Sequence, residues 1–420
     1  MTSLAYAALW AFIFAVPWEN TLVIPGLGTI SRLLGMVALG CAVFSAVVNA
    51  KVRRLRLVHV SAMIFVILAG AGVFRSADSK WALVRFGTYL QLLLVVWMIW
   101  ELANVSRRQL GLMLAYVLGA YVASLATILA YHRGGSGRRF AAAGFDPNDL
   151  GTVLALALPM AWYLGMTYRQ PLLRWICRGF LPLGLVALGL TSSRGALVVG
   201  MVGLLIVPLT MTRLSPARMV GAMLLLIVCG GVAVRYIPEK SLERLSSTTT
   251  EVEEGTLNGR LRIWKAGLTA FAQKPLTGYG TASFKGTVNL MLGNGRVAHN
   301  TYLSVLVEQG LLGFTPWLMM FFAVFLQAVR LRGLERRFAL VLLATLMTAM
   351  LPLTWDDKKA VWFVVGVLAA FCDTLAPRRA GRPRAQPFVR HPIMARPPVP
   401  PRARVGDLSA VPRTGGDAVR

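Results

Sequence analysis

Charged residues are scarce in this chain of 420 residues, at 15% of the sequence, and acidic residues are the scarcer kind, with 17 Asp and Glu against 44 Lys and Arg. A soluble protein covers its surface with many more charged side chains. Hydrophobic residues make up 56% of the sequence, and its mean hydropathy is +0.63. The composition therefore excludes an ordinary soluble protein and predicts an integral membrane protein.

Cysteine is also rare, with four residues that stand alone within apolar segments: Cys41, Cys177, Cys229 and Cys372. Because no two of them have CxxC spacing, they indicate neither a disulfide framework nor a zinc site, and we interpret them as packing residues. The HExxH, Walker and GxSxG motifs are absent, and Asp356-Asp357 lacks the DxD spacing that holds a metal on a nucleotide. The sequence thus predicts no metal site and no cofactor.

What the chain has in abundance is long apolar runs, many of them near the ~20 residues that a helix needs to cross a bilayer. These runs are continuous rather than alternating, which favours helices over a β-barrel. We predict an all-α polytopic fold of about 12 transmembrane helices, near 2–16, 33–50, 57–74, 82–103, 110–131, 150–168, 175–190, 195–212, 219–236, 301–326, 338–353 and 361–376. The first helix follows no basic segment and precedes no small-residue cleavage site, so we expect it to be retained.

The formal net charge of +27 is also compatible with nucleic-acid binding. The arginines, however, cluster in short loops between the predicted helices and in the tail after Pro377, as the positive-inside rule requires. We therefore expect a basic rim against anionic lipid and no nucleic-acid partner. This distribution predicts that both termini lie in the cytoplasm and that residues 237–300 lie on the outer side of the membrane, which is the periplasm in a cell with two membranes.

Four parts follow from this topology. Residues 1–236 hold the first nine helices, 237–300 form a periplasmic loop, 301–376 hold the last three helices, and 377–420 form a basic tail that we expect to be disordered. Several cations fall on the predicted periplasmic side, against the charge rule: Arg133, Arg138, Arg139, Arg194, Lys358 and Lys359. Either a substrate anion or contact with lipid headgroups accounts for them.

The periplasmic loop contains a candidate anion site. Residues 257–272 predict an amphipathic helix whose apolar face carries Leu261, Trp264, Leu268 and Phe271. Arg260 and Arg262 stand at its start, where free backbone N–H groups and guanidinium groups together suit a diphosphate. The alternative is that Glu251, Glu253 and Glu254 neutralise both arginines. The following Pro275-Leu276-Thr277-Gly278-Tyr279-Gly280 is interpreted as a structural turn.

His299 and Asn300 stand at the start of the next predicted helix, with Asn300 as its N-cap. The positive end of that helix and the arginines favour a neutral imidazole, which makes His299 a candidate general base, although a structural or hydrogen-bonding role stays open. Glu308 is an ionisable group within an apolar run and requires a partner. Arg194 is a candidate for that role or for direct contact with a substrate phosphate.

Three segments together resemble the O-antigen ligase family: Arg260 to Trp264 (R-x-x-x-W), Pro275 to Gly280 (P-L-x-G-x-G) and His299 to Gly313 (H-N-x-Y-L-x-x-x-x-E-x-G-x-x-G). Ser192 to Gly195 (S-S-R-G) and Asp146 to Leu150 (D-P-N-D-L) fit the same pattern. The resemblance implies transfer of a glycan from an undecaprenyl-diphosphate carrier to an acceptor hydroxyl on the periplasmic face. The first expectation is a ligase that uses lipid A–core as acceptor, and the alternatives are an O-antigen polymerase and a protein O-oligosaccharyltransferase.

The resemblance and the residues together imply a mechanism. Arg194 and Arg260, with Arg262, would hold the diphosphate, and His299 would deprotonate the acceptor hydroxyl in one inverting displacement. Asn300, Tyr302 and Glu308 would support this site. In a competing arrangement His299 is another diphosphate ligand. A flippase for the same lipid-linked glycan is a more remote alternative, because the candidate charges gather at one face rather than along a path through the membrane.

Overall fold

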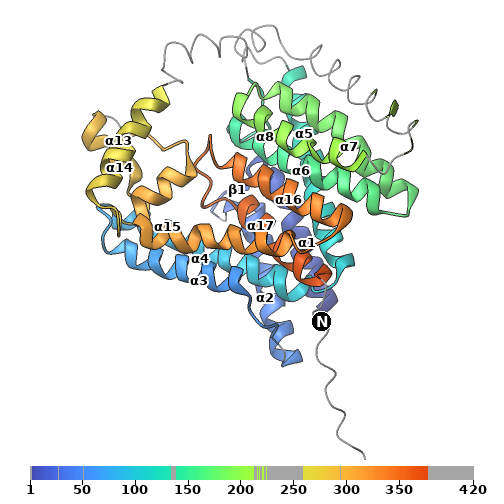
Figure 1. The fold of residues 1–420 in the computed structure, drawn as a ribbon, viewed down its shortest axis with the longest axis horizontal. Coiled ribbons are helices and arrows are strands. Elements are labelled where there is room, and N and C mark those ends of the chain that lie inside the picture. The colour runs from blue at the N-terminus through green and yellow to red at the C-terminus, as the bar shows by residue number, and fades with distance from the viewer. Residues whose placement is uncertain are drawn as a thin grey trace, which may run out of the picture. The chain divides into compact units, whose positions relative to one another are not determined.

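The computed structural model describes residues 2–26, 28–50, 52–133, 139–211, 259–293 and 295–376, together with isolated positions between 215 and 224 (Figure 1). All of them belong to one compact unit, Met1–Pro377. The predicted helix near 219–236 lies almost wholly outside the described residues. The acidic residues at 251–254 and the predicted disordered tail also lie outside them.

Helices occupy every other predicted position: α1 Thr2–Ala15, α2 Ile30–Asn49, α3 Leu57–Val73, α4 Ser79–Leu102, α5 Ser106–His132, α6 Pro147–Thr167, α7 Pro171–Leu190, α8 Arg194–Leu204 with α9 Ile206–Met211, α15 Thr301–Ala328, α16 Gly333–Ala349 and α17 Lys359–Leu375. In the described part of the chain, 7 helices are long and apolar enough to cross a membrane, with α8 and α9 counted as one. The predicted polytopic helical fold is confirmed, but fewer spans than the twelve expected meet this criterion. The remaining helices, α1, α3, α16 and α17, have 14 to 17 residues.

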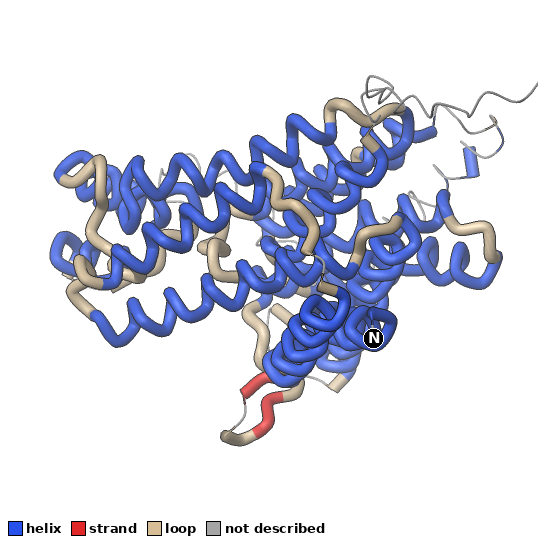
Figure 2. Tube along the Cα trace, turned by 90° about the horizontal axis from the view of Figure 1, so that it is seen from below, coloured by secondary structure: helices blue, strands red, loops and turns tan. Residues whose placement is uncertain are grey.

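One small sheet interrupts the helical architecture. A 3-10 helix, Val16–Thr21, follows α1, and strands β1 (Val23–Ile24) and β2 (Gly28–Thr29) then form an antiparallel hairpin before α2 (Figure 2). Val23 pairs with Thr29 across it. The hairpin is a connection and does not contribute to the core.

The core is centred on α17 and α6, two helices that bury nearly all of their side chains. α17 packs against α4, α5, α15 and α16, and α6 packs against α5, α7, α8 and α16. Aromatic contacts join these helices, as where Tyr163 of α6 stacks on Phe338 of α16 with ring centroids 4.1 Å apart. Cys177 and Cys372 are buried in this core.

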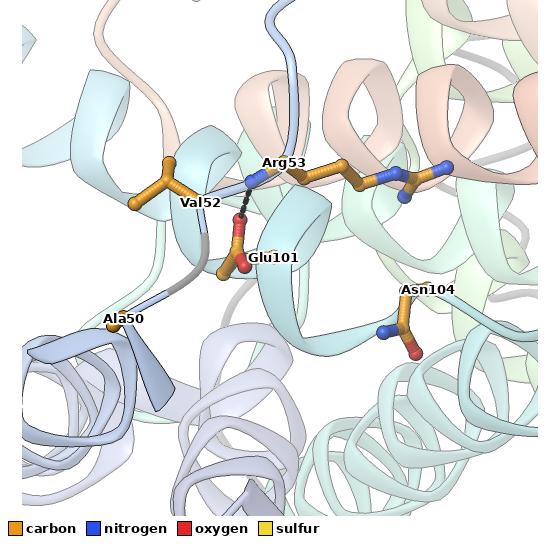
Figure 3. Close-up of a pocket in the computed structure, with 5 residues that line it drawn as sticks. All are labelled: Ala50, Val52, Arg53, Glu101 and Asn104. Atoms are coloured by element: carbon orange, nitrogen blue, oxygen red, sulfur yellow. Dashed lines mark hydrogen bonds between the residues drawn. The ribbon is translucent and has the colours of Figure 1, made fainter. Parts of the chain in front are cut away.

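At the C-terminal end of α17, the basic α2–α3 loop is bound to the protein. The guanidinium of Arg53 lies 2.6 Å from Asp373 and 3.7 Å from the ring centroid of Trp100, and that of Arg56 lies 2.7 Å from Asp373. The backbone N–H of Arg53 donates to Glu101 at 2.9 Å beside an open pocket (Figure 3). These two arginines therefore form ion pairs within the protein in addition to any contact with lipid.

The other end of α17 faces the segment that carries the sequence motifs. α13 (Arg260–Gln273) and α14 (Phe284–Leu292) pack on each other and on the first turns of α15 around their own apolar cluster. The helix α13 confirms the prediction, but its expected apolar face is partly wrong: Leu261 and Leu268 are exposed. The buried face instead consists of Ile263 and the small residues Ala266, Gly267 and Ala270, and at Gly267 a Cβ atom would come within 2.9 Å of Leu303.

The turn after α13 inserts against a break in α15. Gly310 has φ 60° and ψ −168°, so it cannot continue the helix, and the N–H groups of Leu311 and Leu312 donate to the carbonyls of Pro275 and Leu276. In return, Tyr279 and Gly280 donate to the carbonyls of Val307 and Glu308. The prediction that residues 275–280 form a structural turn is confirmed, and this turn holds α13 and α14 on α15.

Candidate functional site

The start of α8 and the start of α6 meet at one polar junction. Ser193 caps α8 by accepting from the N–H of Ala196, and its hydroxyl donates to Asn148 Oδ1 at 2.9 Å. Arg139 Nη2 donates to the same oxygen at 2.6 Å. Arg194, the first residue of α8, therefore projects from a turn that is fixed to α6 and to the segment before it.

Arg260 reaches this junction from a distant part of the sequence. It lines a small pocket with Asn148, Ser193 and Gly195, opposite the start of α8. Burial lowers the pKa of Arg260, and within the described residues no carboxylate forms an ion pair with it. A partly desolvated guanidinium without a counter-ion favours an anionic ligand.

Arg262 differs from Arg260, although both stand in the first turn of α13. Its side chain is exposed and does not line the pocket that Arg260 lines. The structure therefore brings Arg260 to the start of α8, where Ser193 and Gly195 line the pocket and Arg194 between them does not, and it leaves Arg262 at the surface of α13.

His299 lies in a strained turn near Arg260. Its φ is 45°, in the left-handed region that non-glycine residues rarely adopt, and strain of this kind is often found at functional sites. Burial and then the nearby charge of Arg260 lower the pKa of His299, and Asp146 and Asp149 oppose this shift. The imidazole is therefore held in its neutral form, which accepts a proton.

The turn is anchored on both sides. Before it, Trp264 Nε1 donates to the carbonyl of Ala298 at 3.0 Å. After it, the side chain of Asn300 accepts from the N–H of Leu303 at 3.0 Å, which confirms the predicted N-cap of α15. These contacts fix the backbone of His299 between α13 and α15.

A loop between α16 and α17, residues 350–358, braces this turn. Thr301 donates from its N–H to Met350 and from its hydroxyl to Leu353, and it accepts from the N–H of Trp355. Trp355 Nε1 in turn donates to Asp149 Oδ1 at 2.8 Å. The loop thus connects the start of α15, and with it His299, to the start of α6.

Glu308 and Tyr302 have structural contacts. The carboxylate of Glu308 accepts from the N–H groups of Ala282 and Phe284, at 2.9 and 3.3 Å, and Arg85 is the cation that acts on it. These partners take the place of Arg194, which was the partner considered from the sequence. The hydroxyl of Tyr302 donates to the carbonyl of Met347, on α16, at 2.8 Å.

A second charged cluster joins α4 to the same loop. Arg85 Nη1 lies 3.0 Å from the buried Asp356 and its Nε lies 3.4 Å from Asp357, and the hydroxyl of Tyr89 donates to Asp356. Burial raises the pKa of Asp356, and Arg85 opposes this shift. At the start of α17, Lys359 forms an ion pair with Glu19 and a hydrogen bond with Ser31, so lipid contact is not needed to account for it.

The sequence motifs do not predict the contacts of Asn148, Asp149 and Trp355 or the Arg85–Asp356 pair. In the sequence, D-P-N-D-L contributes only to the family resemblance, and Asp356-Asp357 lacks the spacing of a metal motif. A buried arginine in an apolar helix was the signal that could have indicated the pair. Among the described residues, no group of three or more His, Cys, Asp or Glu side chains is arranged to hold a metal ion.

Comparison with known proteins adds one finding. Residues 179–318 match a family model described as O-Antigen ligase, and this span includes Arg194, Arg260, Arg262, His299 and Glu308. Members of this family transfer lipid-linked glycans. Asn148, Asp149 and the 350–358 loop lie outside the matched span. No curated protein matches the chain.

Proposed function

We propose that this protein transfers a glycan from undecaprenyl diphosphate to a hydroxyl of lipid A–core at the periplasmic face of the inner membrane, because residues 179–318 match the O-antigen ligase family model. The observation that carries the proposal is the position of Arg260. It lines the pocket at the start of α8, has no carboxylate partner among the residues that the structure describes, and its charge acts on His299. Arg260, as the proposed diphosphate ligand, thus lies near the neutral imidazole of His299.

Arg260 and Arg194 bind the diphosphate in this mechanism. Guanidinium groups match phosphate oxygens with two parallel hydrogen bonds, and the free N–H groups at the start of α8 add a positive electrostatic potential. As the bond between the anomeric carbon and the phosphate oxygen breaks, its electron pair leaves with the carrier. The arginines stabilise the charge that develops on that leaving group.

His299 acts on the acceptor. Its neutral imidazole takes the proton of the attacking hydroxyl while the hydroxyl oxygen bonds to the anomeric carbon, so each bond that forms is matched by one that breaks. One displacement of this kind inverts the configuration at the anomeric carbon. The turn at His299 is held by the hydrogen bonds of Trp264 to Ala298 and of Thr301 to Leu353, which keep the ring in place during the reaction.

The test is reconstitution of purified protein with an undecaprenyl-diphosphate glycan and three acceptors offered in parallel: lipid A–core, a second carrier-linked glycan and an acceptor protein. We expect product on lipid A–core alone, with inverted anomeric configuration by NMR. Product on the carrier-linked glycan would identify a polymerase, and product on the protein would identify an oligosaccharyltransferase. Absence of any product, together with movement of the carrier lipid across vesicles, would instead support a flippase.

A further inference from the structure

A cavity of about 960 Å³ lies between α4, α14 and the first turns of α15. Its volume is within the range of ligand-binding cavities, roughly 300–1,000 Å³. The mechanism above does not use it. One wall runs from Asp78, the N-cap of α4, along that helix to Thr88. The opposite wall is formed by α14 and by residues shortly before and after His299 in the chain.

The charges that line this cavity are unbalanced. Each of its carboxylates has a partner: Asp78 accepts from the N–H of Trp81, Glu308 accepts from two backbone N–H groups, and Asp357 pairs with Arg85. The lining also carries three further cations, which are Arg75, Lys274 and Lys285. Counted together, the lining has four cations, Arg75, Arg85, Lys274 and Lys285, against these three carboxylates, so one positive charge is in formal excess and the cavity favours an anion.

The contacts of these three cations leave their charge available. The guanidinium of Arg75 donates to the carbonyls of Ala71 and Thr277, and the ammonium of Lys274 lies 4.6 Å from the ring centroid of Tyr279. Neither contact neutralises a positive charge. In the part of the chain that the structure describes, no carboxylate forms an ion pair with Arg75, Lys274 or Lys285.

Exposed apolar side chains accompany the cations. Trp81 and Val84, on the first turns of α4, are 64% and 57% exposed, and Leu290 at the end of α14 is 87% exposed. α4 is one of the helices long enough to cross a membrane, and tryptophan is enriched where such helices meet the headgroup region. The cavity thus combines cations with an apolar margin, which suits a lipid with an anionic head.

The cavity is separate from the pocket that contains Arg260. Pro352 and Leu353 of the 350–358 loop line that pocket, whereas Thr354 and Asp357 of the same loop line the cavity. Ala298, next to His299 in the chain, is also part of the cavity wall. His299 lines neither space itself, but its neighbour Ala298 lines the cavity, and Arg260, which lines the pocket, is close enough to lower the pKa of His299.

We propose that this cavity binds the acceptor, as a glycolipid whose sugar head carries phosphate, and that Arg75, Lys274 and Lys285 bind that phosphate. The inference rests on the proposed function and assigns its two substrates to different sides of the 350–358 loop. The donor diphosphate occupies the Arg260 side, and the acceptor hydroxyl approaches His299 from the cavity.

Binding measurements test this assignment without catalysis. In neutral detergent, the probes are bisphosphorylated lipid A, dephosphorylated lipid A and undecaprenyl diphosphate. We expect Lys274→Gln, Lys285→Gln and Arg75→Gln each to raise the Kd of the bisphosphorylated lipid about 3- to 10-fold, since each removes one charged contact in a partly hydrated site. The triple variant should approach the affinity of the dephosphorylated lipid, while undecaprenyl diphosphate binding stays unchanged.

The matched control is Lys80→Gln with Lys265→Gln, which removes two exposed cations that do not line the cavity. It should leave both affinities unchanged, and all variants should retain the melting temperature of the parent protein. Equal competition by phosphatidylglycerol would overturn the proposal in favour of a general lipid site. Loss of undecaprenyl diphosphate binding in the triple variant would overturn it by assigning the cavity to the donor. If phosphate-dependent binding holds but no glycan is transferred, the proposed function fails and the site stands.

Discussion

Trp355 Nε1 donates a hydrogen bond of 2.8 Å to Asp149 Oδ1, although the two residues are far apart in the chain. The same residue donates its backbone N–H to the hydroxyl of Thr301, two residues after His299. One side chain and one N–H of a single residue therefore connect the start of α6 to the turn that holds the imidazole. We expect this connection to position His299.

Trp355→Phe removes the indole N–H and keeps an aromatic ring in the buried site. Because Asp149 is only half-buried, the loss of this partner should cost about 1 kcal/mol, the low end of the range for an unsatisfied acceptor. If the connection positions His299, the transfer rate at saturating substrate should fall about tenfold, as misplacement of a catalytic group predicts, with little change in the KM of the donor. Steady-state kinetics of the purified variant would measure both quantities.

Trp317→Phe is the matched control, because the indole nitrogen of Trp317 is buried and has no hydrogen-bond partner among the described residues. It should lower stability through lost packing and leave the saturated rate nearly unchanged. Equal rate losses in the two variants would mean that Trp355 contributes only packing.

The extent of sequence prediction differs between local and long-range features. The polytopic helical fold, the Asn300 cap and the turn at residues 275–280 were predicted correctly, although fewer than twelve of the described helices are long enough to span a membrane, because apolar run length, capping side chains and glycine positions act within a few residues. The link from Trp355 to Asp149 and the pair of Arg85 with Asp356 were not predicted. Such contacts join segments whose separation in the chain leaves no local pattern.

The buried face of α13 shows a second reason for error. The spacing of large apolar residues indicated a face with Leu261 and Leu268, but both are exposed. Ile263, Ala266, Gly267 and Ala270 are buried instead, and the small residue Gly267 allows α13 to approach Leu303 of α15 closely. Shape complementarity with a distant helix decided the orientation, and hydrophobicity alone does not encode it.

Arg260→Ala should lower the transfer rate by about 10²–10³, the usual loss when one group that stabilises developing negative charge is removed. Arg194→Ala should have a similar effect. Lysine at either position should rescue transfer only in part, since an ammonium keeps the charge and lacks the planar fork of donors. Single-turnover rates with the lipid-linked donor would measure these losses.

Arg262→Ala is the control for Arg260→Ala, because Arg262 is exposed on the same helix turn and lies outside the pocket. Its rate should stay within about threefold of the parent, as for a surface charge. Equal losses for the two alanine variants would contradict the assignment of the phosphate contact to Arg260. Lysine variants with full activity would contradict the need for a guanidinium.

Gly310→Ala should destabilise the protein. A Cβ atom at this residue would lie 2.3 Å from the carbonyl oxygen of Leu276, and a backbone with φ 60° and ψ −168° is available only to glycine. Strain of this kind costs about 1–3 kcal/mol before any steric clash. The melting temperature in detergent should fall by several degrees. Gly40→Ala, at a helical site where a Cβ meets nothing within 4 Å, should not lower it.

The orientation of the chain is predicted from its loop arginines. Reporter fusions after Leu290 and after Ala376 should give opposite signals, with the first active in the periplasm and the second in the cytoplasm. A fusion after Ala50, in a basic loop, serves as a cytoplasmic reference. If the fusions after Leu290 and Ala376 gave identical signals, the predicted topology of residues 237–376 would be wrong.

The pH dependence of transfer should report the state of His299. Burial and then the charge of Arg260 lower the pKa of this imidazole from its ordinary value of about 6.5, so protonation requires more acidic solution. If the neutral ring is the base, the single-turnover rate should fall on acidification, with the midpoint of this acid limb below pH 6.5. In the residual activity of Arg260→Ala, the acid limb should move to higher pH, because a repelling charge is gone.

His299→Ala separates the two roles considered for this residue. As the base, His299 contributes about 10²–10⁴ to the rate, so the variant should lose turnover and keep most of its affinity for undecaprenyl diphosphate, which the arginines still bind. As a phosphate ligand, His299 would contribute mainly to that affinity, and acidification would strengthen binding by charging the ring. Carrier affinity and single-turnover rate, measured on the same preparation, distinguish these cases. A large loss of affinity with an intact saturated rate would exclude His299 as the base.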